Sequence, residues 1–68
     1  MKTLKDLVIG DSVVRDMCGM KMNLEVTCVH DMCIECGPWV FSRKNGAEID
    51  PELGWNEEET GSYIMVAQ

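Results

Sequence analysis

A strictly alternating stretch at residues 21–28 limits what this chain can fold into more than any other feature of its sequence. Polar residues separate its four apolar ones, Met22, Leu24, Val26 and Cys28. Successive side chains of a β-strand point to opposite faces, so a period of two predicts a strand with one buried face. Such a strand must pack its apolar face against a second layer, and we therefore expect a fold built from β-strands.

Short apolar and β-branched runs elsewhere in the chain indicate further strands. They lie at residues 12–15, 32–36, 39–42 and 62–66, and turn signals separate them at Gly10-Asp11, Cys18-Gly19 and His30-Asp31. Asn45-Gly46 is expected to form a type I′ hairpin turn. Gly37-Pro38 cannot continue a regular ladder, which predicts a bulge or an edge kink. Residues 50–54, with Asp50 as cap and Gly54 as stop, predict a single helical turn.

The length of 68 residues allows one small domain. Five to six short antiparallel strands and one short helical turn make a mainly β fold. We expect the sheet to close into a small SH3-like barrel over residues 1–68, because closure removes edges that would otherwise aggregate. A core of this size often needs support from a metal, a disulfide or a second copy of the chain.

The net charge of −6 comes from one part of the chain. Residues 1–44 contain as many basic as acidic residues, whereas the acidic C-terminal third, residues 45–68, contains no base. This balance disfavours direct binding to nucleic acid, which depends on Lys and Arg, and favours a protein with a basic surface. The expected partner-binding residues are Glu48, Asp50, Glu52, Trp55, Glu57, Glu58 and Glu59. The alternative is that the carboxylates only solvate a loop.

Trp55 stands apart from the other aromatic residues because acidic clusters flank it on both sides. An aromatic side chain rimmed by charge is typical of a protein-contact hot spot. The alternative is that the ring packs beneath its own loop.

The four cysteines are expected to be reduced. The apolar run at residues 7–9 is too short for a signal peptide or a membrane span, so we expect a cytoplasmic protein without a disulfide framework. Cys33 and Cys36 have the spacing of a zinc knuckle, with Cys28 and Cys18 as further candidate ligands and His30 in a polar turn. A structural zinc site takes four ligands, and a second Cys-x-x-Cys pair is missing. We therefore expect core thiols and no cofactor, with zinc as the alternative.

Several short motifs in about the first forty residues resemble a known family. They are Gly10-Asp11-Ser12-Val13-Val14, Gly19, Lys21-Met22-Asn23-Leu24, Ile34-Glu35-Cys36 and Trp39-Val40-Phe41. In this order they are similar to the small YodC-like bacterial proteins, with Gly37-Pro38 as an insertion. The chain also resembles small proteins of phages and mobile elements, many of which inhibit host machinery. The resemblance implies an SH3-like fold and carries over no catalytic residue.

These observations favour a non-enzymatic protein-interaction module, of the phage-inhibitor type, that presents an acidic surface to a basic host protein. The alternative is a zinc-stabilised small structural domain that uses Cys33 and Cys36. A catalytic constellation or a glycine-rich phosphate loop is not recognisable in the sequence. Pairing with a second copy, for instance around Gly37-Pro38, stays open.

Overall fold

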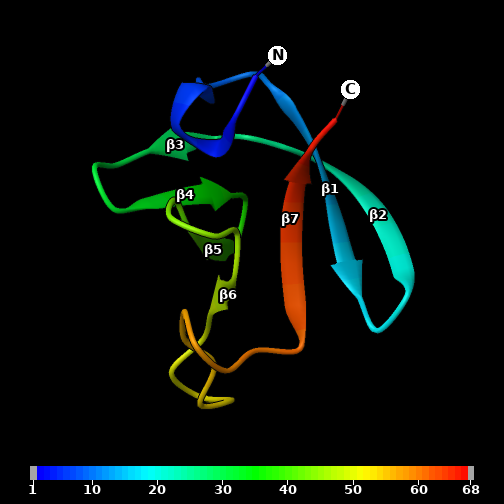
Figure 1. The fold of residues 1–68 in the computed structure, drawn as a ribbon. Coiled ribbons are helices and arrows are strands. Elements are labelled where there is room, and N and C mark those ends of the chain that lie inside the picture. Colours follow the sequence, from blue (N-terminus) through cyan, green and yellow to red (C-terminus); the bar gives the residue numbers. More distant parts are fainter. Residues whose placement is uncertain (1, 68) are drawn as a thin grey trace.

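Antiparallel β-strands are the main secondary structure of the protein, as the sequence predicts. The structure is a computed structural model that describes residues 2–67 (Figure 1). One turn of 3-10 helix, η1 (Leu4–Asp6), precedes the strands β1 (Ser12–Met17), β2 (Met20–Glu25), β3 (Cys28–Val29), β4 (Cys33–Cys36), β5 (Trp39–Ser42), β6 (Glu48–Ile49) and β7 (Ser62–Val66). The mainly β class is therefore confirmed, with its helical turn near the N-terminus.

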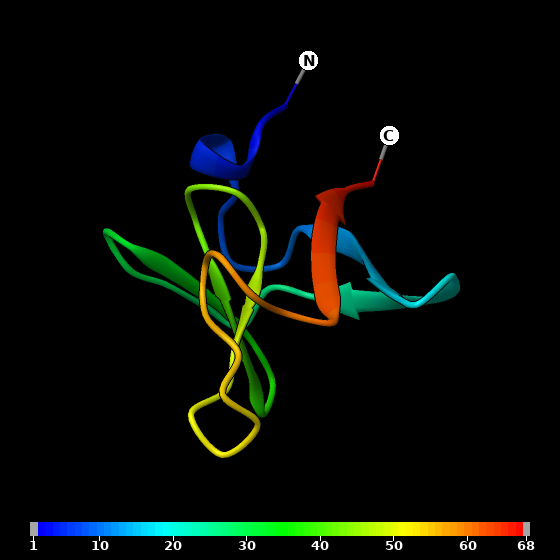
Figure 2. The same ribbon diagram turned by 60° about the horizontal axis from the view of Figure 1, so that its bottom comes forward.

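The strands form two sheets whose strands run in crossed directions (Figures 1 and 2). One sheet has the order β2-β1-β7 and the other the order β3-β4-β5-β6, and all neighbours are antiparallel. An isolated bridge between Ala47 and Tyr63 joins the two sheets at one side. The predicted closure into a barrel is wrong, because the ladders stop at this single bridge instead of continuing around the molecule.

The alternating stretch at residues 21–28 serves both sheets and is divided between them. β2 ends at Glu25, and the chain enters β3 at Cys28. Between them, the Val26 amide donates to the carbonyl of Asp11, which precedes β1 of the first sheet, at 2.9 Å. The Thr27 amide donates to the carbonyl of Glu35, in β4 of the second sheet, at 2.8 Å. The predicted strand is therefore bent at residues 26–27. The side chain of Val26, at this bend, is fully buried in the core.

The core lies between the facing sides of the two sheets. Its buried members are Leu7, Val13, Val26, Ile34, Cys36, Phe41 and Ile64. Two charged residues, Arg15 and Glu48, are also buried there, with 6% and 3% of their surface exposed. Burial of charge is costly unless the charges are paired, and these two form an ion pair with each other.

Two tight turns connect neighbouring strands. Cys18 and Gly19, with φ of 54° and 89°, join β1 to β2 as expected of a type I′ turn. Gly37 and Pro38 join β4 to β5 directly, since Cys36 pairs with Trp39. Gly37 has a φ of 65° and the proline ring fixes the next φ near −65°, a combination that suits a type II′ turn. The predicted bulge at Gly37-Pro38 is therefore wrong, and the glycine and proline form the hairpin turn itself.

The hairpin at Asn45-Gly46 is present, but its turn is longer than the predicted type I′ turn. Ser42 and Ala47 close the loop, and only Gly46 in it has a positive φ, 80°. The neighbouring strand β7 accounts for the longer turn, because the Gly46 carbonyl accepts a hydrogen bond from the Ile64 amide at 2.8 Å. A Cβ atom at Gly46 would lie 2.4 Å from the Ile64 carbonyl oxygen, so this approach requires glycine.

Candidate functional site

An acidic lobe, defined here as residues 50–61, projects from the sheets between β6 and β7. It is the yellow and orange loop at the bottom of Figure 1, and its yellow part lies at the bottom of Figure 2. Backbone hydrogen bonds between Asp50 and Trp55, of 3.0 and 2.9 Å, close its base. A hydrogen-bonded turn stands where the helical turn is predicted, at residues 50–54. The Leu53 amide donates to the Asp50 carbonyl at 3.2 Å, and the Asp50 carboxylate accepts from the Glu52 amide at 3.0 Å, as expected of a cap.

A second set of hydrogen bonds fixes the other half of the acidic lobe. The Asn56 side-chain oxygen accepts from the amides of Glu58 at 2.8 Å and Glu59 at 3.0 Å. The Asn45 side-chain amide reaches across from the β5–β6 loop and donates to the Glu57 carbonyl at 2.8 Å. Asparagine in such positions replaces missing backbone partners, so side chains of the lobe and Asn45 outside it together hold the lobe's backbone.

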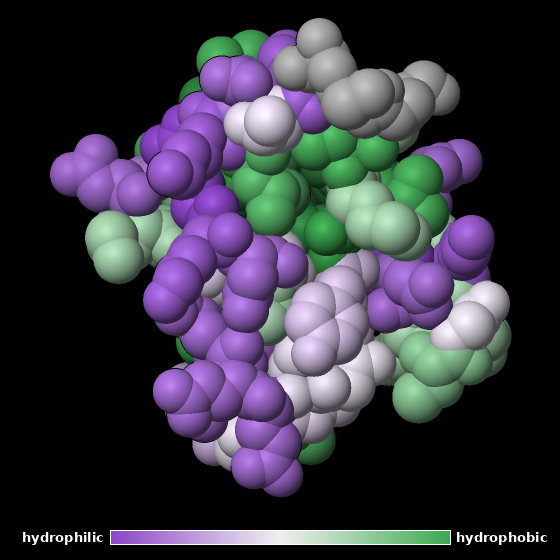
Figure 3. Space-filling view, viewed as in Figure 1, coloured by the Kyte–Doolittle hydropathy of each residue, from purple (hydrophilic) through white to green (hydrophobic). Residues whose placement is uncertain are grey.

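The carboxylates predicted to bind a partner differ in their exposure. Glu52, Glu58 and Glu59 are exposed, and Asp50 and Glu57 are half-buried. Glu48 is buried and bonded to Arg15, so its side chain cannot be part of a contact surface. In the space-filling view, hydrophilic residues cover the region of the lobe (Figure 3). The structure thus gathers five of the six predicted carboxylates on the lobe and removes Glu48 from the set.

Trp55 is half-buried at the base of the acidic lobe. A Cβ atom at Gly61 would lie 3.1 Å from its Cζ2 atom, so the ring packs against the returning chain. The apolar side chain that the lobe does expose is Leu53, with 59% of its surface accessible. Sequence reasoning missed Leu53, although its place between Glu52 and Gly54 in a turn is a signal for exposure.

The predicted zinc knuckle at Cys33 and Cys36 is not formed. Both residues lie on β4, and residues three apart on a strand point to opposite faces. Cys36 is buried in the core, where burial raises the pKa of its thiol, whereas Cys33 lies on the other face and is half-buried. Cys18 is exposed in the β1–β2 turn. The two thiols of the knuckle therefore cannot share one ion.

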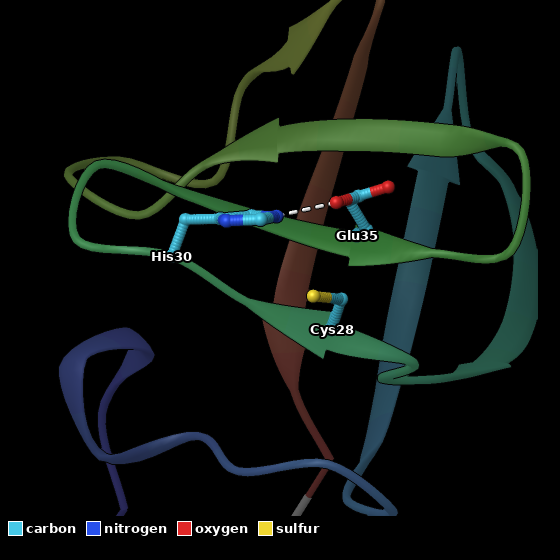
Figure 4. A group of neighbouring side chains, drawn as sticks. All are labelled: Cys28, His30 and Glu35. Atoms are coloured by element: carbon cyan, nitrogen blue, oxygen red, sulfur yellow. Dashed lines mark hydrogen bonds and ion pairs between the residues drawn. The ribbon is translucent and has the colours of Figure 1, made fainter.

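A different group of metal-ligating side chains lies on the outer face of the second sheet: Cys28, His30 and Glu35. One ligand atom of each lies within 4.8 Å of the others (Figure 4). Cys28 and Glu35 are directly opposite each other on β3 and β4, and His30 follows Cys28 by two residues. Figure 4 shows the imidazole pointing at the carboxylate, and His30 Nε2 and Glu35 Oε2 form a hydrogen bond.

An open hollow of about 450 Å³ lies beside the β3–β4 turn and is lined by three basic side chains. Lys5, Arg43 and Lys44 line it together with Asp31 and Met32. The Arg43 guanidinium donates to the carbonyls of His30 at 2.9 Å and Lys5 at 2.6 Å, and so ties the N-terminal segment to this turn. Its two terminal nitrogens are occupied by backbone, and we assign no ligand to the hollow.

Comparisons with models of protein families, with curated proteins and with solved structures found no match. Within residues 2–67, no helix combines the length and the apolar character needed to cross a membrane. The function is therefore argued from the geometry of the acidic lobe and of the Cys28, His30 and Glu35 group.

Proposed function

We propose that the protein is a non-enzymatic interaction module that docks its acidic lobe onto a basic surface of another protein. The phage-type resemblance adds that the partner is a host protein and that docking inhibits it. The observation that carries the proposal is the internal bonding of the lobe, because a charged loop that only solvated the surface would not need it.

Preorganisation is what makes this bonding useful for recognition. Ordering a loop on binding consumes part of the interaction energy, and a loop that is already ordered avoids that cost. The side chains of Asp50, Asn56 and Asn45 hold the two turns of the lobe. The exposed Glu52, Glu58 and Glu59 are consequently presented by a fixed backbone, with Leu53 as an apolar contact among them.

The distribution of charge supports a basic partner. Arg15 and Glu48 neutralise each other inside the protein, so this pair leaves the net charge of −6 unchanged. The acidic lobe contains Asp50, Glu52, Glu57, Glu58 and Glu59 and no base. A surface of one sign accelerates association with a surface of the opposite sign and suppresses wrong partners.

The experiment begins by capturing host proteins from a lysate on the immobilised chain. The captured partner is then purified, and its affinity is measured for the wild type and for Glu52→Gln, Glu58→Gln and Glu59→Gln over a series of salt concentrations. We expect each substitution to weaken binding and the wild-type affinity to fall as salt rises. Asp31→Asn, an exposed carboxylate in the β3–β4 turn, is the matched control and should bind as the wild type does. An affinity indifferent to both salt and the three lobe substitutions would refute the proposal.

A second candidate function is metal binding, favoured by the proximity of Cys28, His30 and Glu35. Thiolate, imidazole and carboxylate are the three side chains that bind zinc in proteins, and three protein ligands leave a fourth position for water or a partner's group. This ligand set replaces the predicted Cys33 and Cys36. The ion would link β3 to β4 at the end of the hairpin. It would thereby stabilise the fold, as in the zinc-stabilised structural domain considered above.

Cobalt titration of the reduced protein tests this second function. Binding through Cys28 should produce a thiolate-to-cobalt charge-transfer band in the near ultraviolet, and zinc should displace the cobalt. Cys28→Ser and His30→Gln should abolish the band, and a chelator should lower the melting temperature of the zinc-loaded protein. Cys18→Ser, in a turn outside the group, should behave as the wild type. Cobalt binding that survives Cys28→Ser would exclude this site.

A further inference from the structure

β2 has an open edge of six residues. Within the part of the chain that the structure describes, β1 is the one strand that pairs with β2. The opposite edge of the same sheet, at β7, is partly covered, because Ile64 and Tyr63 contact the β5–β6 loop through Gly46 and Ala47. An open edge offers unpaired N–H and C=O groups to another strand, and β2 has no proline or bulge that would block one.

The pairing of β2 with β1 determines which backbone N–H and C=O groups of β2 face β1 and which face the open edge. Met17 and Met20 flank the two-residue turn of the hairpin, and such a pair exchanges hydrogen bonds. Val26 likewise uses both its N–H and its C=O on Asp11 and Gly10. The even-numbered residues therefore point their backbone groups at β1. The odd-numbered Lys21, Asn23 and Glu25 point theirs outward, to the open edge.

We propose that two copies of this chain pair through β2, antiparallel and with a two-fold axis at Asn23. In this register Asn23 lies opposite its own copy, and Lys21 lies opposite Glu25 of the second copy. All three outward-pointing residues then form hydrogen-bonded pairs, which supplies about six backbone hydrogen bonds at two per pair. The result is one six-stranded antiparallel sheet across both copies.

Charge complementarity selects this register among those that the backbone permits. Lys21 and Glu25 lie on the same face of the strand, two residues on either side of Asn23. The two-fold axis at Asn23 therefore creates two opposite-charge pairs, one on each side of the axis. Shifting the axis by one residue to Met22 or to Leu24 would separate Lys21 from Glu25 of the second copy. Cross-strand pairs of opposite charge stabilise a sheet, and like charges oppose it.

The other face of β2 also gains from this pairing. Met20 and Met22 expose 75% and 48% of their surface, although their side chains point toward the core side of the sheet. In the proposed register Met22 lies opposite Leu24 of the second copy, and the apolar surface of both is covered. A chain of this length has a small core, and a second copy is one of the usual means of adding to it.

Charge-swap variants of the full chain test the proposed dimer by analytical ultracentrifugation over a range of concentrations. Lys21→Glu or Glu25→Lys alone places like charges opposite each other twice and should weaken the dimer by at least about tenfold. The double variant, with both substitutions, restores both pairs and should recover the wild-type dissociation constant. An equimolar mixture of the two single variants also restores both pairs, and should form a heterodimer.

The mixture separates pairing from folding, because a single variant that has lost its fold cannot be rescued by another chain. Lys44→Glu makes the same charge change outside the edge and should leave the dimer intact. A wild type that stays monomeric at millimolar concentration would overturn the proposal. A dimer that forms equally well in both single variants would also overturn it, since its interface would then lie elsewhere.

Discussion

Arg15 of one sheet and Glu48 of the other form an ion pair of 2.6 Å in the space between the sheets. The guanidinium also donates from Nε to the Ser62 hydroxyl at 2.9 Å, and its carbon lies 4.7 Å from the centre of the Trp39 ring. Three separate strands therefore converge on one buried cation. The pair links the two sheets where they share no continuous ladder.

Removing one member of this pair should strongly destabilise the protein. In Glu48→Gln the Arg15 charge stays buried without a counter-charge, and breaking such a pair costs about 3–5 kcal/mol. Urea unfolding followed by tryptophan fluorescence measures the free energy of unfolding. The double variant Arg15→Met with Glu48→Leu should lie much closer to the wild type, since it removes both charges. Equal losses in the single and the double variant would contradict this account of the pair.

Glu48 belongs to the core, although its sequence neighbours place it with the acidic surface. Local patterns predicted the strands, since the alternation around Leu24 and the turn at Cys18-Gly19 depend on neighbouring residues. The sequence pattern around Glu48 predicts an exposed carboxylate, because its partner, Arg15, is 33 residues away. A charge count contains no information on such pairing.

The sequence indicates only part of the candidate metal site for the same reason. Cys28 and His30 lie two residues apart, but the sequence places His30 in a polar turn beyond the strand. Glu35 joins them only through the register of the β3–β4 hairpin, in which Cys28 pairs with Glu35. The Cys-x-x-Cys spacing of Cys33 and Cys36 suggested a knuckle, but in a strand the same spacing separates the two thiols.

The close approach of β7 predicts that Gly46 does not tolerate a side chain. Gly46→Ala combines a φ of 80° with a Cβ atom 2.4 Å from the Ile64 carbonyl oxygen, and we expect a loss of about 3 kcal/mol in the free energy of unfolding. Gly19→Ala is the matched control. It has a similar φ of 89° but open space around the new atom, so it should lose only about 1 kcal/mol. Equal losses would show that contact with β7 plays no part.

Acid should weaken the attachment of the N-terminal segment through Asp11. A hydrogen bond from the Lys2 ammonium, and then one from the Val8 amide, lower the pKa of this carboxyl below its ordinary value of 3.8. A lowered pKa in the folded state stabilises the protein above pH 3.8, and this contribution is lost as the pH falls through the lowered value. Asp11→Asn should therefore melt below the wild type at neutral pH, and the difference should shrink as the pH falls through the lowered value.

The same attachment can be followed directly by NMR titration of the Asp11 carboxyl. Lys2→Met removes the main cause of the shift, so the midpoint should rise toward 3.8. An unchanged midpoint in this variant would show that Lys2 does not hold Asp11 in solution.

The four thiols should differ widely in their reactivity with iodoacetamide. Cys18 is exposed in the β1–β2 turn and should be alkylated first. Cys36 has 2% of its surface exposed, and burial raises the pKa of its thiol, so both access and thiolate formation oppose the reaction. Its alkylation must wait for opening of the core, and its rate should increase steeply with urea concentration. Mass spectrometry of peptides resolves the four rates, and fully unfolded protein, in which the four should be similar, is the control. Alkylation of Cys36 as fast as that of Cys18 in the folded protein would mean that β4 does not bury this residue in solution.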